Sequence, residues 1–331
     1  MPVSISVPTI KSVRKFFSYD TVVASLVATI IVVFVYKHGV RYNQRIAEGF
    51  DDQSDRSDGS DGSAGGPVDV RTTVADIYDT DYADIYDALC DDPGKHKFEV
   101  EHIIGKTNVT ADSSILDVGS GTGHIVETLA KERGCAVVGI DKSAAMHKKA
   151  STLYPSRDFR NEDALTSIAF EDESFTHITC LYFTLYYIKD KHTLFKNCYD
   201  WLKPGGSMVV HLVNKHMFDP VLPPGNPLQS VNAQKYAKER IVQTNIVFNK
   251  YNYTSEFLLD DVNDGKTQFV ETFSTKRGKK VFKKNVHTFH MGDRSDILTL
   301  AKQMGFIVKA KYDMSPCSYE YNFLYVLTKP H

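Results

Sequence analysis

Apolar and polar positions follow two alternating periods from about residue 70 onward, which predicts strands and helices in turn. Short apolar, β-prone runs predict strands at 115–118, 136–140, 157–160, 175–183 and 207–213. Segments with a helical period lie between them, at 125–130, 143–153 and 191–202. Strands that alternate with helices at this pitch indicate crossover connections, so we expect a mostly parallel sheet.

Two further helices are expected before the first of these strands, at 74–89 and 97–104. One face of the first helix collects large apolar and aromatic side chains. These are Ile77, Tyr78, Tyr82, Ile85, Tyr86 and Leu89. The helix either covers the core or forms a tyrosine-lined lid over a pocket.

The alternation stops after residue 213, and residues 214–292 are expected to form a β-rich insertion that serves as a lid. A helix-like segment at 230–244 precedes three β-rich segments at 246–259, 267–275 and 280–291. Turn residues at 263–265 and 276–278 separate these segments, as in hairpins. A helix at 295–304 and strands at 306–312 and 322–328 follow. Their nine-residue connection is too short for a crossover helix, so we expect an antiparallel terminal hairpin.

The first 69 residues have a different character from the rest of the chain. A tail at 1–18 precedes an uncharged apolar run at 21–36, which predicts a transmembrane helix over 19–37. A signal peptide and a buried helix are the alternatives, but no small-residue cleavage site follows the run. Residues 38–69, rich in Asp, Ser and Gly, are expected to form a linker to a domain at 70–331. The Lys and Arg residues on the two sides of the run do not decide its orientation.

The composition limits the partners and the compartment of the chain. A net charge of -2 provides no general attraction to nucleic acid or anionic membranes. Five scattered cysteines without a C-x-x-C pair favour reduced thiols over disulfides or a zinc site. We therefore expect no metal, and a single-pass membrane protein whose domain at 70–331 faces the cytoplasm.

The most informative stretch is Ile115–Gly123, an apolar strand that ends in Asp117 and Val118 and is followed by three alternating glycines. Glycine tolerates a positive φ and has no Cβ, so such a turn lets the backbone approach a ligand closely. The spacing G-x-G-x-G differs from the G-x-G-x-x-G turn that binds dinucleotides. By itself the turn also fits a plain tight turn.

Acidic residues after the next strands indicate which ligand the turn binds. Asp141 ends the second strand about twenty residues later, where a carboxylate can bind both hydroxyls of a ribose. Asp163 follows the third strand and can accept from an exocyclic amine such as that of adenine. Asp117 would repel a pyrophosphate but suits a cationic amine or a sulfonium.

The ordered series ILDVGSGTG, VVGIDKS, NEDAL and WLKPGGSMVV resembles the motifs of class I S-adenosylmethionine-dependent methyltransferases. The resemblance covers about residues 78–213 and implies a Rossmann-like seven-stranded sheet. It implies S-adenosyl-L-methionine as the cofactor, bound by residues of the first three motifs and by one residue near the end of the fourth strand. These are Asp117, Gly119, Gly121, Gly123, Asp141, Asp163, Ala164 and Leu181. His177 departs from the family, in which an acid usually begins the fourth strand.

The methyl acceptor is less constrained, because methyl transfer needs mainly alignment, with a base only for a protonated acceptor. The N-P-P-Y motif of DNA and glutamine amino-methyltransferases is absent after the fourth strand. Tyr182 and Tyr186 are weak candidates for the catalytic site; together with Tyr187 they either line the acceptor pocket or belong to the core. His287 is a candidate base; His290, three positions on, should face the opposite side of the same strand.

Three functions remain open at this point. The first is methylation of a small-molecule or lipid-like acceptor by a membrane-tethered enzyme. The second is methylation of RNA or protein that docks on a basic hairpin at 276–284, although nucleic acid is disfavoured by the net charge. The third is a cofactor-binding scaffold without catalysis, against which the intact motifs argue.

Overall fold

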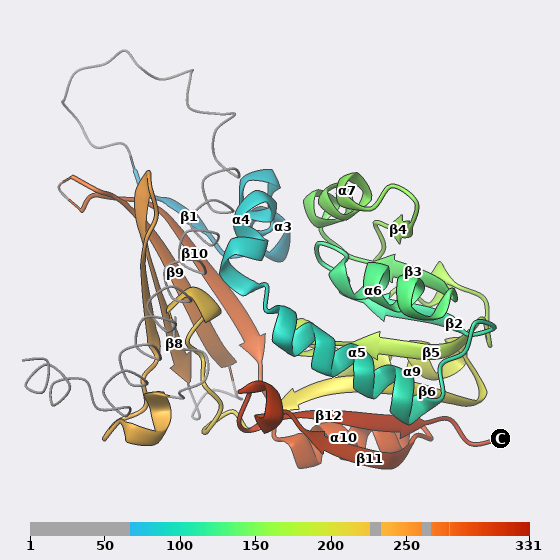
Figure 1. The fold of residues 1–331 in the computed structure, drawn as a ribbon. Coiled ribbons are helices and arrows are strands. Elements are labelled where there is room, and N and C mark those ends of the chain that lie inside the picture. The colour runs from blue at the N-terminus through green and yellow to red at the C-terminus, as the bar shows by residue number, and fades with distance from the viewer. Residues whose placement is uncertain (1–66, 226–232, 260–265, 278) are drawn as a thin grey trace, which may run out of the picture. The chain divides into compact units, whose positions relative to one another are not determined.

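The computed structural model describes residues 67–225, 233–259, 266–277 and 279–331. Two sheets organise this part of the chain (Figure 1). The larger sheet has seven strands in the order β11-β12-β6-β5-β2-β3-β4. They are β2 (Ser114–Val118), β3 (Ala136–Ile140), β4 (Asp158–Arg160), β5 (Phe175–Cys180), β6 (Leu202–Val213), β11 (Ile307–Asp313) and β12 (Asn322–Thr328).

Five strands of the larger sheet, β2 to β6, pair in parallel. Helices α6 (His124–Arg133), α7 (Ala144–Leu153) and α9 (Lys191–Trp201) lie between successive strands in the sequence and supply crossover connections. The last strand, β12, pairs antiparallel with both β11 and β6. The predicted mostly parallel sheet with an antiparallel terminal hairpin is therefore confirmed.

Alternating side chains of the larger sheet contribute to two separate apolar cores. Ile115 of β2 and Val209 of β6 belong to one core, with α5 (Pro93–Thr107) and α6. Their neighbours Leu116 and Val210 belong to the other, with α9 and α10 (Arg294–Gln303). Burial on both faces explains why these strands read as continuous apolar runs rather than as alternating ones.

The second sheet is built mainly by the segment that follows β6. It has five strands in the order β1-β10-β9-β8-β7, and β7 to β10 form an antiparallel meander. The short strand β1 pairs in parallel with β10. The strands are β1 (Asp69–Arg71), β7 (Gln243–Val247), β8 (Tyr251–Leu259), β9 (Lys266–Thr275) and β10 (Val281–His290). The predicted β-rich segments are thus present as strands of one sheet.

Two helix predictions are corrected by the structure. The described residues from 233 to 244 form only a 3-10 turn at Ala233–Tyr236 and the start of β7. Val242 accepts a backbone hydrogen bond from Phe257 (2.9 Å), so pairing with β8 overrides the local helical preference. The helix expected at 74–89 is divided into α3 (Val74–Ile77) and α4 (Thr80–Cys90), because the Asp79 carboxylate caps the second helix at Tyr82 N (2.8 Å).

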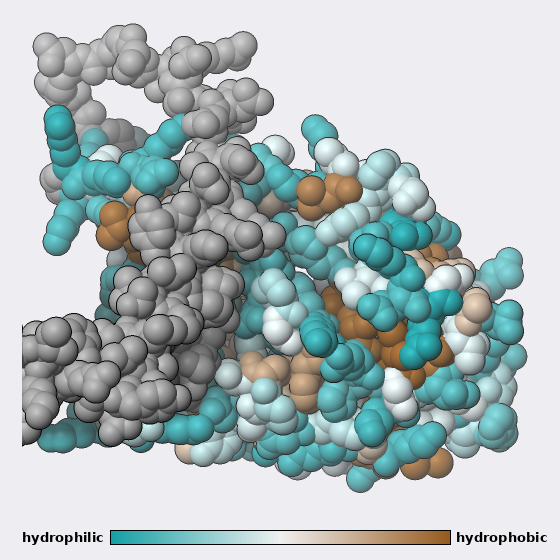
Figure 2. Space-filling model, in the orientation of Figure 1, coloured by the Kyte–Doolittle hydropathy of each residue, from teal (hydrophilic) through white to brown (hydrophobic). Residues whose placement is uncertain are grey.

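The predicted tail, membrane helix and most of the linker lie outside the described residues, as does the turn at 263–265. Among the residues that the structure describes, no helix is long and apolar enough to cross a membrane. The described residues on the face shown in Figure 2 present mainly hydrophilic surface with small hydrophobic patches.

Candidate active site

A cavity of about 430 Å³ opens beyond the carboxyl ends of β2 and β3. One side is lined by the glycine turn and the acids that follow the strands. The other side is lined by aromatic residues from α4, from α8 (Thr184–Tyr187), from the second sheet and from Tyr78, which follows α3. Pockets of small-molecule enzymes have this size and this mixture of apolar walls and few polar groups.

The glycine turn begins where β2 ends, and its backbone takes the conformation that glycine alone adopts without strain. Gly119, Gly121 and Gly123 have φ values of 72°, 55° and 90°. Gly119 N and Ser120 N both donate to Ile140 O of the adjacent strand, at 2.8 and 2.9 Å. A Cβ on Gly119 would lie 2.4 Å from the side chain of Thr184, so a larger residue does not fit there.

Gly123 plays a different part from the other two glycines. It precedes α6 and is not among the residues that line the cavity. A Cβ at this position would lie 2.5 Å from the Phe159 ring. Its local effect is therefore on the packing of α6 against β4.

Asp117, which is buried, and Asp141, which is partly buried, bring two carboxyl groups to the cavity. Asp117 Oδ1 accepts a hydrogen bond from Thr179 Oγ1 (2.6 Å). Burial raises the pKa of Asp117 to about 7 despite this bond, and the nearby Glu99 adds to the effect. Asp141 accepts from Gly121 N (3.0 Å) and Ser143 N (2.8 Å), so it ties the glycine turn to β3. Burial raises the pKa of Asp141 as well.

Asp163 lies nearer the solvent. Its partial burial would raise its pKa, but the hydrogen bond (2.7 Å) and charge of Lys142 Nζ, together with the hydrogen bond from Leu165 N, lower it overall. Leu165 N donates to the other carboxylate oxygen (3.0 Å). Both Asp163 and its neighbour Ala164 line the cavity, as does Leu181.

Seven of the eight predicted cofactor residues thus border one cavity, and Gly123 is the exception. The backbone turn, the predicted ribose partner Asp141 and the partly buried Asp163 after β4 fit an adenosine. The buried Asp117 fits a cationic group on the methionine side. Which atoms each residue binds stays a prediction.

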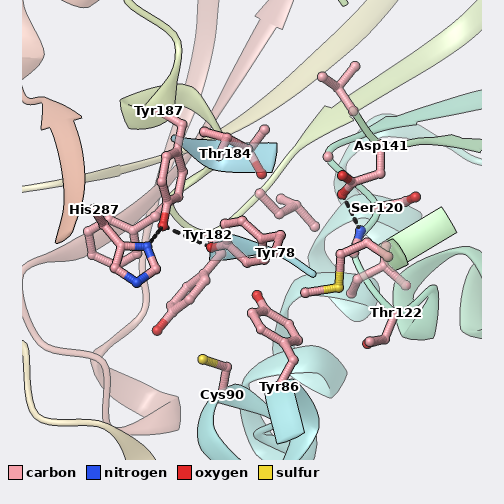
Figure 3. A pocket seen from close by; sticks show the side chains of 18 of the residues that line it. Tyr78, Tyr86, Cys90, Ser120, Thr122, Asp141, Tyr182, Thr184, Tyr187 and His287 are labelled. Atoms are coloured by element: carbon pink, nitrogen blue, oxygen red, sulfur yellow. Dashed lines mark hydrogen bonds between the residues drawn. The ribbon is translucent and has the colours of Figure 1, made fainter. Parts of the chain in front are cut away.

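Helix α4 covers the cofactor side through contacts that the sequence did not reveal. Asp87 of α4 accepts from Thr122 Oγ1 (2.6 Å) and lies 3.1 Å from His124 Nε2, both in the glycine region. Tyr86 of α4 and Tyr78 before it line the cavity (Figure 3). Tyr82 of α4 lines it as well. The tyrosines of the predicted lid therefore face the pocket.

The other side of the cavity is an aromatic chamber. We use this term for five phenylalanines that line it: Phe183, Phe218, Phe257, Phe269 and Phe289. They come from the loop before α8, from the segment after β6 and from three strands of the second sheet. Their rings pack edge-on or tilted, as Phe183 does on Phe218 (centroids 5.5 Å apart) and on Phe289 (5.2 Å).

A polar chain borders this chamber and begins at the buried Glu271 of β9. Glu271 Oε1 accepts from the hydroxyls of Tyr82 (2.8 Å) and Tyr253 (2.7 Å). Glu271 Oε2 pairs with Asn285 Nδ2 (2.9 Å) and with His287 Nε2 (2.8 Å). Burial alone would raise the pKa of Glu271, but His287 and these hydrogen bonds hold it below its usual value.

The chain continues from His287 to the surface of the cavity. His287 Nδ1 is 2.5 Å from the hydroxyl of Tyr187, which is 2.8 Å from the hydroxyl of Tyr78. Figure 3 shows the three side chains joined in this order. Sequence reasoning missed Glu271, although its position was readable: buried Thr267 and Phe273 alternate with exposed or half-buried neighbours along β9, and Glu271 shares their face.

A second polar cluster lies near Asp117. Lys95 Nζ is 3.2 Å from Glu99 Oε2 and 4.7 Å from the centre of the Tyr182 ring. Burial lowers the pKa of His211 to about 3, so its imidazole is neutral; its Nε2 bonds Asn322 (3.0 Å). Lys95 and Glu99 line the cavity, whereas nothing in the local pattern of α5 marked them beforehand.

The three weak catalytic candidates have different positions. Tyr182 and His287 line the cavity, and Tyr182 has a φ of 50°. Tyr186 is 1% exposed, does not line the cavity, and accepts a hydrogen bond from Val213 N (2.8 Å). Its placement is that of a core residue. His290 is also absent from the lining, in keeping with its expected place on the other face of β10.

Comparison with known proteins identifies similar methyltransferases. Residues 116–210 match the model of the methyltransferase domain family. A demethylmenaquinone methyltransferase from Chlorobaculum parvum is 27% identical over 218 residues, 66% of this chain and 74% of that protein. A ubiquinone biosynthesis O-methyltransferase from Pasteurella multocida is 29% identical over 129 residues, 35% of this chain but only 52% of that protein.

Solved structures agree on the fold. An S-adenosylmethionine-dependent methyltransferase from Clostridium acetobutylicum superimposes with a TM-score of 0.54 at 18% identity. The match covers 76% of this chain and 96% of that one. At this identity the likeness concerns the fold alone.

Proposed function

Because this chain is a class I S-adenosylmethionine-dependent methyltransferase, we propose that it methylates a small acceptor molecule held in the aromatic chamber. One observation carries the proposal: a single cavity runs from the glycine turn and Asp141 to His287 and the phenylalanines. A donor and an acceptor placed at its two ends share one space. Such placement supplies the alignment on which methyl transfer mainly depends.

The size and lining of the cavity support a small acceptor over a macromolecule. About 430 Å³ must hold both the methionine end of the cofactor and the acceptor. The five phenylalanines provide an apolar wall for a ring or a short hydrocarbon. The similar proteins from Chlorobaculum parvum and Pasteurella multocida are named for quinone-related small molecules.

The experiment is transfer of a labelled methyl group from S-adenosylmethionine to compounds in a metabolite and lipid extract. We expect label in one or a few small products with the wild-type chain, and much less label, at a limiting concentration of S-adenosylmethionine, with an Asp141→Ala variant. Label found only in RNA or protein would contradict the proposal. No label anywhere, with no cofactor binding by calorimetry, would favour a scaffold without catalysis.

We also propose that residues 19–37 anchor the enzyme in a membrane, with the catalytic domain facing the cytoplasm. The uncharged run at 21–36 and the Asp-, Ser- and Gly-rich stretch after it support this. In a full-length variant with Ile30→Lys and Val33→Lys, two charges should prevent the helix from crossing the bilayer. We expect the wild-type chain to resist an alkaline carbonate wash of membranes and the variant to be released. Release of both would contradict the anchor.

A further inference from the structure

We propose that Glu271, His287, Tyr187 and Tyr78 form a proton relay that removes the proton of an aromatic hydroxyl on the methyl acceptor. The inference rests on the proposed function and names its acceptor class. The four side chains form one unbroken series of hydrogen bonds, from a carboxylate without solvent exposure to a hydroxyl that borders the cavity.

The inner end of the relay is a fixed negative charge. Glu271 is 0% exposed and lies within hydrogen-bonding distance of Tyr82, Tyr253, Asn285 and His287. Four partners for two carboxylate oxygens stabilise the ionised form. An ionised carboxylate only accepts, so His287 Nε2 carries a hydrogen and donates it to Glu271.

This donation determines the state of the other ring nitrogen. When His287 is neutral and its hydrogen is on Nε2, Nδ1 has a lone pair and accepts from the Tyr187 hydroxyl. Tyr187 then accepts from Tyr78, whose own oxygen is free to accept from a molecule in the cavity. The geometry thus orders the donors from the cavity inward.

Tyr187 and Tyr78 each pass a proton on and remain neutral phenols before and after the transfer. Burial raises the pKa of Tyr187 and of Tyr78 well above the ordinary value, so both phenols stay neutral at physiological pH. Two further groups face His287. One is Tyr82, whose pKa is also raised by burial. The other is the carboxylate of Glu271. Within the relay, Nδ1 of His287 supplies the nitrogen lone pair that accepts the proton.

Proton and methyl transfer balance without another reactant. The acceptor oxygen forms a bond to the methyl carbon, and the electron pair of the broken carbon–sulfur bond stays on sulfur. The acceptor's proton moves to Tyr78, the hydrogen of Tyr78 moves to Tyr187, and that of Tyr187 moves to His287 Nδ1. The resulting imidazolium is paired with the Glu271 carboxylate. A phenol is the acceptor that fits, because its ring matches the aromatic chamber and its hydroxyl needs a base near neutral pH.

A spectroscopic experiment tests the proton transfer without turnover. The full-length protein, saturated with S-adenosylhomocysteine, is titrated with 4-nitrophenol at a pH at which the free phenol is mostly neutral. The absorbance distinguishes the phenolate from the neutral phenol. We expect bound phenolate with the wild-type chain and bound neutral phenol with His287→Gln and Tyr187→Phe. His290→Gln, a histidine change on the same strand outside the cavity lining, serves as the matched control and should behave as wild type.

A second experiment measures turnover with phenols of graded acidity, and with benzylamine for comparison. It distinguishes a proton relay from a latch, by which we mean hydrogen bonds that only hold the segment after α3 against the second sheet. His287→Gln should lower kcat/KM by about 100-fold for the least acidic phenol. It should have little effect on an acceptor that is already ionised. An equal loss for every phenol would overturn the relay and leave a latch. Methylation of benzylamine but of no phenol would overturn the acceptor class, while labelled products from the extract would still uphold the proposed function.

Discussion

The two sides of the cavity are built differently. The side at the glycine turn, the proposed cofactor side, is shaped by backbone. The side at the aromatic chamber, the proposed acceptor side, is shaped by side chains. Gly119 and Gly121 form the cofactor side through their positive φ values and missing Cβ atoms. Both glycines lie within a few residues of the end of β2. The acceptor side brings together Tyr78, Tyr187 and His287, separated by 109 and 100 positions in the sequence. A local turn tolerates changes elsewhere in the chain, but a network assembled from distant segments depends on every segment that it joins.

The largest effect expected from this difference concerns the stability of the acceptor side. Glu271→Ala leaves the buried donors of Tyr82, Tyr253 and His287 without their acceptor. We expect the free energy of unfolding to fall by about 3–5 kcal/mol, measured by urea denaturation. Glu256→Ala, which removes a more exposed acid on β8, should cost less than about 0.5 kcal/mol. Equal effects of the two variants would contradict the structural importance of the network.

A change on the cofactor side should act on binding. Asp141→Ala removes the acceptor of Gly121 N together with the predicted partner of the ribose. We expect S-adenosylmethionine affinity, measured by calorimetry, to fall by about 1.5–3 kcal/mol. Asp158→Ala, on the neighbouring strand β4, should leave the affinity unchanged because its partner is the exposed Arg160. Unchanged affinity in Asp141→Ala would remove the ribose assignment.

The raised pKa of Asp117 predicts a smaller effect that depends on pH. With a pKa of about 7, most Asp117 side chains are protonated at pH 6 in the free protein. If a cationic group of the cofactor binds there, Asp117 must lose its proton, so affinity should rise about tenfold from pH 6 to 8. Calorimetry in buffers of different ionisation enthalpy should detect proton release near pH 6. Asp117→Asn should abolish it; release that persists would point to Glu99 or Asp141, whose pKa values are also raised.

The same shift has a consequence for folding. The folded chain holds the Asp117 proton more tightly than the unfolded chain, whose Asp has a pKa of about 3.9. This contribution to stability is present at low pH and is lost as the pH rises from about 4 to about 7. Asp117→Asn should therefore flatten that part of the stability profile of the cofactor-free protein.

The smallest effect is expected at the basic hairpin. Lys276, Arg277, Lys279 and Lys280 are exposed at the turn between β9 and β10, far along the strands from His287. Replacing the four by Gln should change neither cofactor affinity nor the unfolding free energy by more than about 0.5 kcal/mol. A large loss of labelled product, dependent on salt, would instead show docking of a charged acceptor.

Prediction from sequence succeeded where neighbouring residues decide the structure. The strand before Gly119 and the acids after the next strands were readable because the ends of parallel strands meet at one edge of the sheet. It failed at 233–244, where pairing of β7 with β8 prevailed over local helical preference. It also missed Lys95 and Asp87, because a charged residue on a helix is usually solvated and only the fold places these two at the cavity.

The sequence by itself determined the parallel sheet, the glycine turn and the methyl donor that fits it, because each depends on short-range backbone conformation and on the order of strands. Only the tertiary structure decided which polar groups face the acceptor. Along the chain, Glu271 is one more acid on a β-strand, and its role appears when β8, β9, β10 and α4 bring four partners around it. Because Glu271 is shielded from solvent, leaving its charge without these partners would cost free energy of folding. The contacts are therefore specific to this arrangement of strands and helix.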